Sequence, residues 1–216
     1  DIVLATEGGV RLYKNTGGRF ALKDIPQFEL ADANVFLVAF VDADGDDRPD
    51  LFASAYGGMN YLLYNTDGSF GDARLEALPG DHRLTLSAGF GDLDGNGSLD
   101  IILGNWSSGI EKLFAPSQST NVILLRDGDR YRQQMLDEIR GETNSVLVSH
   151  LNDDNFPDIV IGNDRLVPDF VYFGAGNGEF VSPTAAGVDV PRTTMFTMSV
   201  ESADFNNDLR PDIFST

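Results

Sequence analysis

The stretch "FVDADGDDRPDLFAS", residues 40–54, places five aspartates within nine residues and then becomes apolar. Two carboxylates about 4 Å apart repel each other by roughly 4 kcal/mol at the effective dielectric of a protein surface. Crowded negative charge beside a hydrophobic run therefore needs something to offset the repulsion.

The same pattern recurs along the chain. Related segments are "FGDLDGNGSLDIILG" (90–104), "SHLNDDNFPDIVIGN" (149–163) and "SADFNNDLRPDIFST" (202–216). The final aspartates are Asp50, Asp100, Asp158 and Asp212, and Asp1 in "DIVLA" has the same place. A period of about 50 to 58 residues is typical of arrays of four-stranded units.

Each period has the pattern of strands. "NVFLVAFVD" precedes the first acidic stretch, and "DLFASAY" follows it. "NYLLYNTDGSF" then predicts two strands joined at Asp67-Gly68 by a type I′ turn, which requires positive φ. Hairpins are predicted in the same slot at 10–20, 122–131 and 170–180. The segment 131–141 is nearest to a helical pattern, but it falls in the slot of an outer strand.

These observations predict an all-β fold, a β-propeller of four-stranded antiparallel blades, because radial packing of repeated units protects sheet edges. A β-sandwich is the alternative, but it would not require near-identical loops at a fixed phase. The chain is expected to be a single propeller segment of about four blade equivalents, part of a larger ring. The predicted units are a partial blade at 1–34, blades at 35–84, 85–144 and 145–194, and a partial blade at 195–216.

Composition excludes several classes of protein. The 216 residues carry a formal charge of -19, with only 15 Lys and Arg. Binding to nucleic acid or insertion into a membrane is therefore not expected. No cysteine is present, and no apolar run approaches the roughly 20 residues of a membrane span. The opening "DIVLATEGG" has no signal-peptide pattern. A mature or trimmed chain would look the same.

The acidic stretches are best explained as calcium loops. If each is numbered 1 to 9, positions 1, 3, 5 and 9 carry side-chain oxygens, and position 7 offers its backbone carbonyl. Several hard oxygen ligands in an irregular cage suit Ca²⁺ better than Mg²⁺, and softer metals would need Cys or His. The ligands predicted for three sites are Asp42, Asp44, Asp46, Arg48 and Asp50; Asp92, Asp94, Asn96, Ser98 and Asp100; and Asp204, Asn206, Asp208, Arg210 and Asp212.

Position 4 supports a tight loop. It holds Gly45, Gly95, Asp153 and Asn207, residue types that best tolerate left-handed backbone. An EF-hand is excluded, because the first two loops lack the Glu at position 12 and lead into strands. Solvated Asx turns are the other explanation, but three good copies in phase favour a metal.

The third loop departs from the pattern. Its positions 1, 3, 5 and 9 are His150, Asn152, Asp154 and Asp158. Only two carboxylates remain, and His is a poor calcium ligand. A fourth calcium site, with Asn152, Asp154 and Asp158 as ligands, is therefore expected to be weak, completed by water or empty, and His150 is equally well explained as a surface residue.

At "DADGDDRPD", "DLDGNGSLD" and "DFNNDLRPD", and at the hairpins "LYKNTGGRF" and "LLYNTDGSF", the chain resembles the FG-GAP/VCBS repeats of integrin-α-like propellers. Its last stretch also resembles repeats of the bacterial ASPIC/UnbV-associated type. The resemblance covers essentially the whole chain. It implies calcium in the loop between the first two strands of a blade, commonly seven blades in a ring, and an extracellular, cell-surface or periplasmic location. It also implies binding of proteins or glycans, as in cell adhesion, more often than catalysis.

Antiparallel connections place the calcium loops on one face of a propeller and leave the opposite face free for a partner. The link in 100–131 is the longest of its kind and contains Trp106 and Phe114, candidate ligand-binding residues that could equally pack the link onto its blade. Asn105 also begins a glycosylation sequon. Arg83, Arg140 and Arg192 lie in links on the same face.

The predicted function is that of a non-catalytic, calcium-stabilised propeller that binds a protein or a glycan. Nearly every clustered carboxylate is explained as a metal ligand. Neither His82 nor His150 lies in a catalytic pattern, and no GxSxG motif is present. The alternatives are a propeller-fold enzyme that acts on polysaccharides and a purely structural assembly module.

Overall fold

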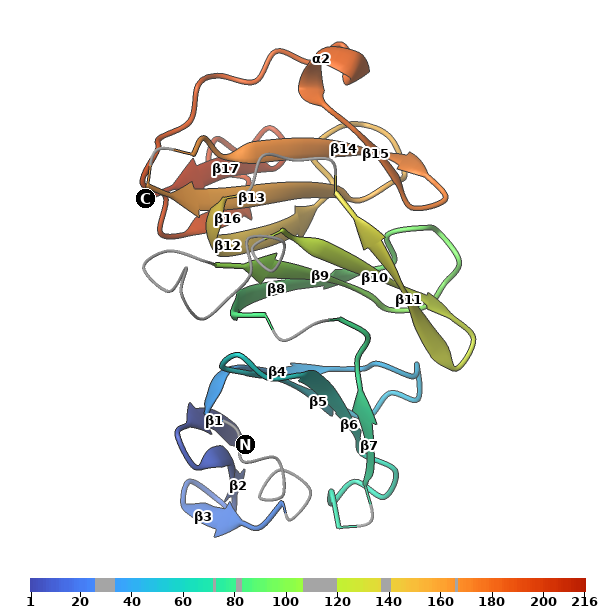
Figure 1. Cartoon of the computed structure of the whole chain (residues 1–216), viewed down its shortest axis with the longest axis vertical. Helices are drawn as coiled ribbons and strands as arrows, with labels where there is room; N and C mark the ends of the chain where they lie inside the picture. The colour runs from blue at the N-terminus through green and yellow to red at the C-terminus, as the bar shows by residue number, and fades with distance from the viewer. Residues whose placement is uncertain (26–33, 72, 81–82, 107–119, 137–140, 166) are drawn as a thin grey trace. The chain divides into compact units, whose positions relative to one another are not determined.

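The computed structural model describes residues 1–25, 34–71, 73–80, 83–106, 120–136, 141–165 and 167–216. They form antiparallel sheets in two compact units, Asp1–Thr85 and Leu86–Thr216 (Figure 1). Each unit is described by itself.

The first unit contains two sheets whose strands follow one another in chain order. One sheet has three strands, β1 (Ile2–Thr6), β2 (Gly9–Asn15) and β3 (Phe20–Lys23). The other has four, β4 (Val35–Val41), β5 (Asp50–Ala55), β6 (Asn60–Tyr64) and β7 (Arg74–Ala77).

The second unit contains three sheets, and Thr85 at its border begins the first strand. Four strands form the first sheet, β8 (Thr85–Gly91), β9 (Asp100–Asn105), β10 (Val122–Asp127) and β11 (Arg130–Met135). Four more form the next, β12 (Glu142–Ser149), β13 (Asp158–Asp164), β14 (Phe170–Gly176) and β15 (Glu179–Val181). A short helix, α2 (Pro183–Ala186), precedes a pair of strands, β16 (Val200–Ala203) and β17 (Asp212–Ser215).

The prediction of four-stranded antiparallel units is confirmed in the sheets β4–β7, β8–β11 and β12–β15. Of the segment with the nearest helical pattern, residues 131–135 lie in strand β11, which pairs with β10 along its whole length, and residues 137–140 lie outside the described residues. The predicted hairpins are present at each site.

The turn type predicted at Asp67-Gly68 is wrong. Gly68 has a φ of 73°, but Asp67 is not left-handed, and the strands close only at the pair Tyr64 and Arg74. Both central residues have positive φ at Asn177 and Gly178, as a type I′ turn requires. The longer link at 65–73 instead contains Asp67, which accepts hydrogen bonds from the backbone and hydroxyl groups of Ser69.

Neighbouring sheets within a unit pack face to face through strand residues that alternate in direction. In the first unit, Val10 and Leu12 of β2 pack with Leu51 and Leu63 of the next sheet. In the second, Ile102 and Ile123 pack with Ile159 and Ile161, while Val160 and Val171 pack with Val200 of β16. Burying an aliphatic side chain contributes about 1.5–3 kcal/mol, so these layers are the main source of stability.

Hydrogen bonds between polar side chains connect successive sheets at the end remote from the acidic loops. Asn121, just before β10, donates to the hydroxyl of Thr143 in β12 (2.9 Å). Thr197 donates to Asp169, just before β14 (2.8 Å). Asn60 and Thr85, both within the first unit, form the corresponding bond (3.2 Å). A buried threonine of the following repeat is thus satisfied by a polar side chain at the start of the third strand.

Candidate metal centre

Each acidic loop connects the ends of two paired strands. Val41 pairs with Asp50, Ser149 with Asp158, and Ala203 with Asp212. Each loop therefore begins just after one strand and ends at the aspartate that opens the next, so strand register fixes the position of both ends.

The aspartate at position 1 folds the loop around itself. Asp42 accepts hydrogen bonds from the backbone N–H groups of Gly45 (2.9 Å), Asp46 (3.1 Å) and Asp47 (3.0 Å). Asp92 accepts the three corresponding bonds in the second loop. Asp204 accepts two of them, from Asp208 and Leu209. A carboxylate that receives several N–H groups fixes the backbone with or without a metal.

The left-handed backbone predicted at position 4 is confirmed for Gly45, Gly95 and Asn207. It is wrong for Asp153 in the third loop, which has no positive φ. There the residue at position 1 is His150, whose Nδ1 lies 3.1 Å from the carbonyl of Phe156. An imidazole cannot accept the two or three N–H groups that the aspartate at position 1 accepts in the other loops, so the third loop follows a different path.

A second left-handed position was not predicted. Position 6 also has positive φ, at Asp47 (65°), Gly97 (82°) and Leu209 (68°). Glycine in the second loop and aspartate in the first were the available signals, because both tolerate left-handed backbone, whereas leucine rarely adopts it.

In the first three loops the aspartate at position 9 is buried and links two parts of its sheet. Asp100 accepts from Leu93 (2.7 Å) in the loop and from Arg126 (2.7 Å) in β10. Asp50 and Asp158 make the same two connections in their own sheets. Asp1 accepts from Asn15 in the same way, which supports its equivalence to the final loop aspartates.

Burial raises the pKa of these carboxyl groups. It is the largest influence on Asp50, Asp100 and Asp158, it exceeds the opposing effect of the backbone N–H groups, and nearby aspartates add to it. The pKa of Asp100 is raised to about 6. A bound cation would stabilise the ionised form of such a group.

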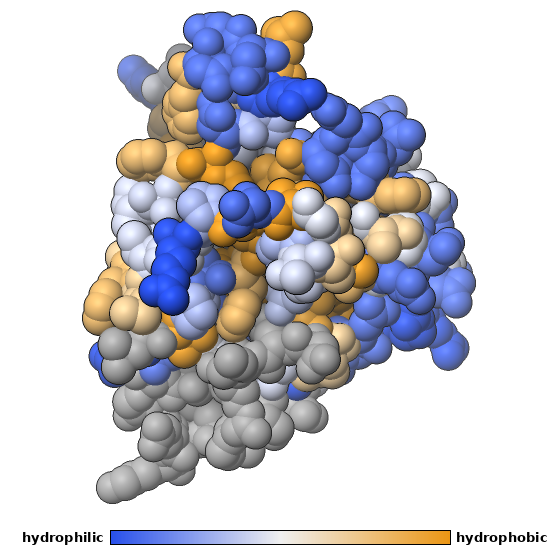
Figure 2. All heavy atoms as spheres, turned by 90° about the horizontal axis from the view of Figure 1, so that it is seen from above, coloured by the Kyte–Doolittle hydropathy of each residue, from blue (hydrophilic) through white to orange (hydrophobic). Residues whose placement is uncertain are grey.

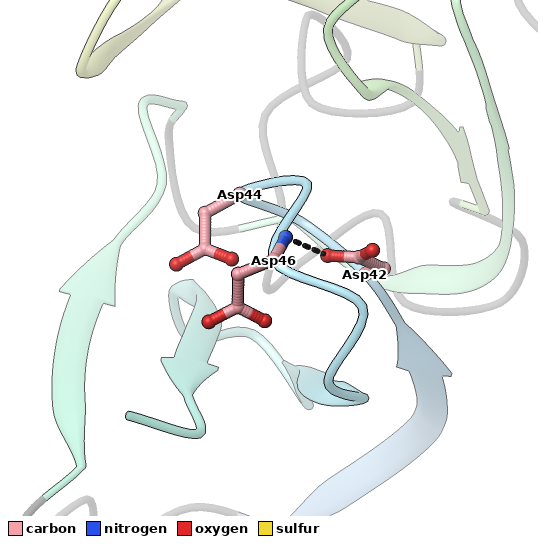
Figure 3. Close-up of side chains that lie close together, drawn as sticks. All are labelled: Asp42, Asp44 and Asp46. Atoms are coloured by element: carbon pink, nitrogen blue, oxygen red, sulfur yellow. Dashed lines mark hydrogen bonds between the residues drawn. The ribbon is translucent and has the colours of Figure 1, made fainter. Parts of the chain in front are cut away.

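Two clusters have the spacing that a single ion requires. One carboxylate oxygen each of Asp42, Asp44 and Asp46 lies within 4.8 Å of the others, and the same holds for Asp92, Asp94 and Asp100. Figure 3 shows the carboxylates of Asp44 and Asp46 side by side, with Asp42 joined to the backbone of Asp46. Ca²⁺ binds oxygens at 2.3–2.6 Å, so ligands on opposite sides of the ion lie about 5 Å apart. Spacing and donor chemistry therefore fit Ca²⁺.

The other predicted ligands are arranged differently. Asp50 is not part of the first cluster but lies against the backbone, as described above. Asn96 bonds Asp94 and the carbonyl of Arg126. The side chain of Arg48 pairs with Asp46 and donates to the carbonyl of Asn65. Ligation by the carbonyls of Arg48, Ser98 and Arg210 stays a prediction.

The third and fourth loops do not form a close group of three acidic side chains among the residues that the structure describes. In the third loop, Asn152 donates to Asp154. In the fourth, Asn206 accepts from Asp208, and Asp212 accepts from Phe205. Arg210 reaches the third loop and pairs with Asp153 at 2.8 Å. The fourth loop thus keeps the turn of the first two without their carboxylate spacing.

The residues predicted for the opposite face have different environments. Trp106 is partly buried, and Phe114 and Arg140 lie outside the described residues. Arg83 is buried, so it does not offer its charge to a partner. Asn105 is also buried and donates to the carbonyl of Thr120, which excludes glycosylation of the folded chain.

Arg192, by contrast, is exposed and lines a cavity of about 870 Å³ in the second unit. The cavity lies between the start of β14 and the segment 182–195 that contains α2. Its other walls include Phe170, Tyr172, Asp189 and Met195. Both segments are links on the side opposite the acidic loops. Figure 2, viewed from the side of α2, shows hydrophobic residues at the surface between hydrophilic ones.

Comparison with known proteins agrees with this geometry. A family model described as "FG-GAP-like repeat" matches three stretches, residues 1–53, 42–103 and 150–215. Among solved structures, the chain is similar to one titled "Structure of Dos1 propeller", with a TM-score of 0.52 and 17% identity. The match covers 90% of this chain and 45% of that chain. No curated protein sequence matches.

Repeated antiparallel sheets with acidic loops, and the similarity to a solved propeller, define a β-propeller protein. The three repeat matches make the assignment more specific: the chain belongs to the FG-GAP-like repeat family. None of the helices in the described parts is long and apolar enough to cross a membrane.

Proposed function

We propose that this chain is a non-catalytic propeller module that binds calcium in its acidic loops and presents the opposite face to a protein or glycan partner. The observation that carries the calcium proposal is the pair of three-aspartate clusters, each with carboxylate oxygens within 4.8 Å. Since like charges repel at this separation, a divalent cation would relieve the repulsion that folding creates.

Several observations favour binding over catalysis. The carboxyl groups with raised pKa are Asp50, Asp100 and Asp158, and each is occupied by backbone N–H groups inside its sheet. A catalytic acid or base must instead reach the reacting atoms of a substrate. The described cavity has aromatic walls and one exposed arginine, a surface suited to recognition.

A location outside the cytoplasm fits the proposed calcium sites. Extracellular modules bind Ca²⁺ with dissociation constants on the order of 10⁻⁴–10⁻³ M. Partly exposed sites such as the first cluster would be filled at the calcium concentrations found there. The family resemblance supports the same setting.

Calcium binding is tested by isothermal titration of metal-free protein with CaCl₂ and by melting curves in calcium and in chelator. We expect binding at the first two loops and a higher melting temperature with calcium, while equal MgCl₂ has a smaller effect. Asp44→Asn should remove binding at the first loop, and Asp189→Asn is a matched acidic control remote from the loops. Absence of heat and an unchanged melting temperature would contradict the proposal.

The partner face is tested with glycan arrays and protein pull-downs, using Arg192→Ala and Trp106→Ala. Arg192→Ala should weaken binding if the cavity is the recognition site. A loss only with Trp106→Ala would move the site to the link after β9. Turnover of a polysaccharide by the purified protein would instead favour the enzyme.

A further inference from the structure

A cavity of about 410 Å³ lies in the first unit, between the sheet of β1–β3 and the sheet of β4–β7. Three basic side chains line it: Lys14 of β2, Lys23 of β3, and Arg48 at position 7 of the first acidic loop. The chain has only 15 Lys and Arg against 34 Asp and Glu, so this group of positive charges contrasts with an acidic background. We call the space the basic cavity.

Strand register directs both lysines toward the cavity. Lys23 lies opposite Leu12 across β2 and β3, and Leu12 packs on the next sheet. Lys14 is two residues beyond Leu12 on β2, so its side chain is on the same side of the strand. The pleat therefore places both ammonium groups on the side of the sheet that faces β4–β7.

The corresponding contact in the second unit is closed. By strand pairing, Lys14 corresponds to Leu125 of β10. In the same way, Lys23 corresponds to Gln134 of β11. Gln134 donates to the carbonyl of Gly178 in the next sheet at 2.6 Å. A Cβ built on Gly178 would lie only 2.7 Å from Cδ1 of Leu125, so this turn packs tightly on the pair.

The first unit leaves the same place open. Gly68 lies in the link between β6 and β7, as Gly178 lies between β14 and β15, and it lines the basic cavity. A Cβ built on Gly68 would meet no atom within 4 Å. Two lysines in place of a leucine and a glutamine, together with the longer link at 65–73, account for the opening. The residues that differ belong to strands and a link inside the chain.

Two of the three cations have no acidic partner in the described structure. Arg48 pairs with Asp46, but neither Lys14 nor Lys23 forms an ion pair with a carboxylate among the residues that the structure describes. Asp1 also lines the cavity, and one of its oxygens accepts a backbone N–H group of β2. The basic cavity therefore offers two positive charges to an anion.

We propose that the basic cavity binds a sugar acid, a hexuronate whose carboxylate lies between Lys14 and Lys23. Ammonium groups form charge-assisted hydrogen bonds with a carboxylate. Phe40, which is 39% exposed, and Pro49 line the same cavity and offer apolar surface to the C–H face of a sugar ring. A volume of about 410 Å³ is within the range of small-molecule sites.

The charge of the whole chain favours a ligand with a single negative charge. A formal charge of -19 repels a polyanion at long range, whereas one carboxylate meets two ammonium groups at short range. The site goes beyond the proposed function, because it adjoins the first acidic loop instead of the opposite face and requires no calcium.

The experiment is a titration of the ¹⁵N-labelled chain, freed of calcium by chelating resin, with sodium D-glucuronate and sodium D-galacturonate. We expect saturable shifts of the amide signals of Asn65 and Gly68, with a dissociation constant on the order of 1 mM for a ligand of this size. Glucose and galactose, the neutral counterparts, should cause no saturable shift. Added NaCl should weaken the binding of both acids.

Variants of the two lysines identify the site. Because a unit charge about 4 Å away changes affinity about fivefold even in water, Lys14→Gln and Lys23→Gln should each weaken binding by about that factor. Lys14→Arg and Lys23→Arg should retain it. Arg11→Gln is the matched control and should leave binding unchanged, because Arg11 lies on β2 but on the other side of the strand from Lys14. The double variant Lys14→Leu, Lys23→Gln installs the pair of the second unit and should abolish binding.

Circular dichroism verifies that each variant is folded. Absence of saturable shifts with both acids would overturn the proposal, as would equal binding of the neutral sugars. An equal loss in Arg11→Gln would show a general effect of charge and would overturn it too. Shifts caused by a blocked Gly-Asp-Gly peptide and by neither sugar acid would overturn it in favour of an acidic peptide.

Discussion

Individual aspartates in the acidic loops have different roles, which the structure distinguishes. Those at positions 1 and 9 accept backbone N–H groups and shape the loop, as Asp42 and Asp50 do. Asp44 at position 3 has no comparable bond in the described structure and belongs only to the three-aspartate cluster. The same acidic stretch thus contains residues that shape the loop and a residue whose role would be confined to the proposed metal site.

Asp100 both accepts backbone N–H groups and belongs to a three-aspartate cluster, so its substitution should affect stability and calcium binding together. Asp100→Asn places an amide where the carboxylate accepts N–H groups from Leu93 and Arg126. Because the amide has one acceptor oxygen where the carboxylate has two, one buried N–H group is left unpaired at a cost of about 1–3 kcal/mol, and we expect the free energy of unfolding without calcium to fall by that amount. Asp44→Asn is the control and should leave metal-free stability unchanged or slightly raised. Urea unfolding measures the free energy of unfolding of both variants. Equal losses would contradict the separation of loop-shaping aspartates from Asp44.

The raised pKa of Asp100 predicts an unusual dependence of stability on pH. In calcium-free protein, the folded state binds this proton up to a pH of about 6, against 3.8 for the ordinary group. This contribution to stability is therefore complete below pH 3.8 and is lost as pH rises through 6. The pKa values of Asp50 and Asp158 are shifted in the same direction.

We accordingly expect the melting temperature of calcium-free protein to fall between pH 5 and pH 7. With saturating calcium the trend should reverse, since the ion binds the ionised form. Chelating resin removes calcium at both pH values, and Asp100→Asn should flatten the calcium-free trend. A calcium-free melting temperature that rises over this range would count against the assignment.

Among the elements, loops and hairpins differ in how far sequence predicts them. Asp, Asn and Gly in phase predicted the acidic loops and the left-handed Gly45, Gly95 and Asn207. The path of the third loop was missed because Asp153 is a residue type that tolerates positive φ without requiring it. The partner of each final aspartate was also missed, because Asn65, Arg126 and Gly174 contribute only backbone N–H groups.

The third loop can be used to test what position 1 contributes. His150→Asp restores a carboxylate that can accept the N–H groups of the loop, as Asp92 does. We expect one additional calcium per chain, measured by equilibrium dialysis with ⁴⁵Ca²⁺. His150→Asn offers an acceptor without the charge and should bind more weakly. Stoichiometry that is identical in all three proteins would contradict the role assigned to position 1.

For the whole molecule, a formal charge of -19 sets the electrostatic background. Self-repulsion among so many carboxylates destabilises the compact state. The acidic clusters concentrate this repulsion, while calcium sites would reduce it. The total charge follows from the sequence because charge is additive, but the sequence could not predict which of the four loops brings three carboxylates within 4.8 Å of one another.

Higher ionic strength should therefore stabilise the calcium-free protein and weaken its binding of calcium. Raising NaCl from 10 mM to 500 mM shortens the Debye length from about 30 Å to a few Å. We expect the melting temperature of calcium-free protein to rise by several degrees and the affinity for calcium to fall. Equal concentrations of choline chloride separate screening from specific sodium binding; a response to sodium alone would refute the screening explanation.

The polar bonds at the end remote from the acidic loops have a consequence for how such a chain can change in evolution. Asn121 bonds Thr143 in the following repeat, and Thr197 bonds Asp169 in the preceding one. Each bond involves only adjacent repeats and uses the same two positions. Duplication or loss of one whole repeat would therefore regenerate every such bond at the new junction. The number of repeats can vary between descendants of one gene without leaving a buried polar group unsatisfied.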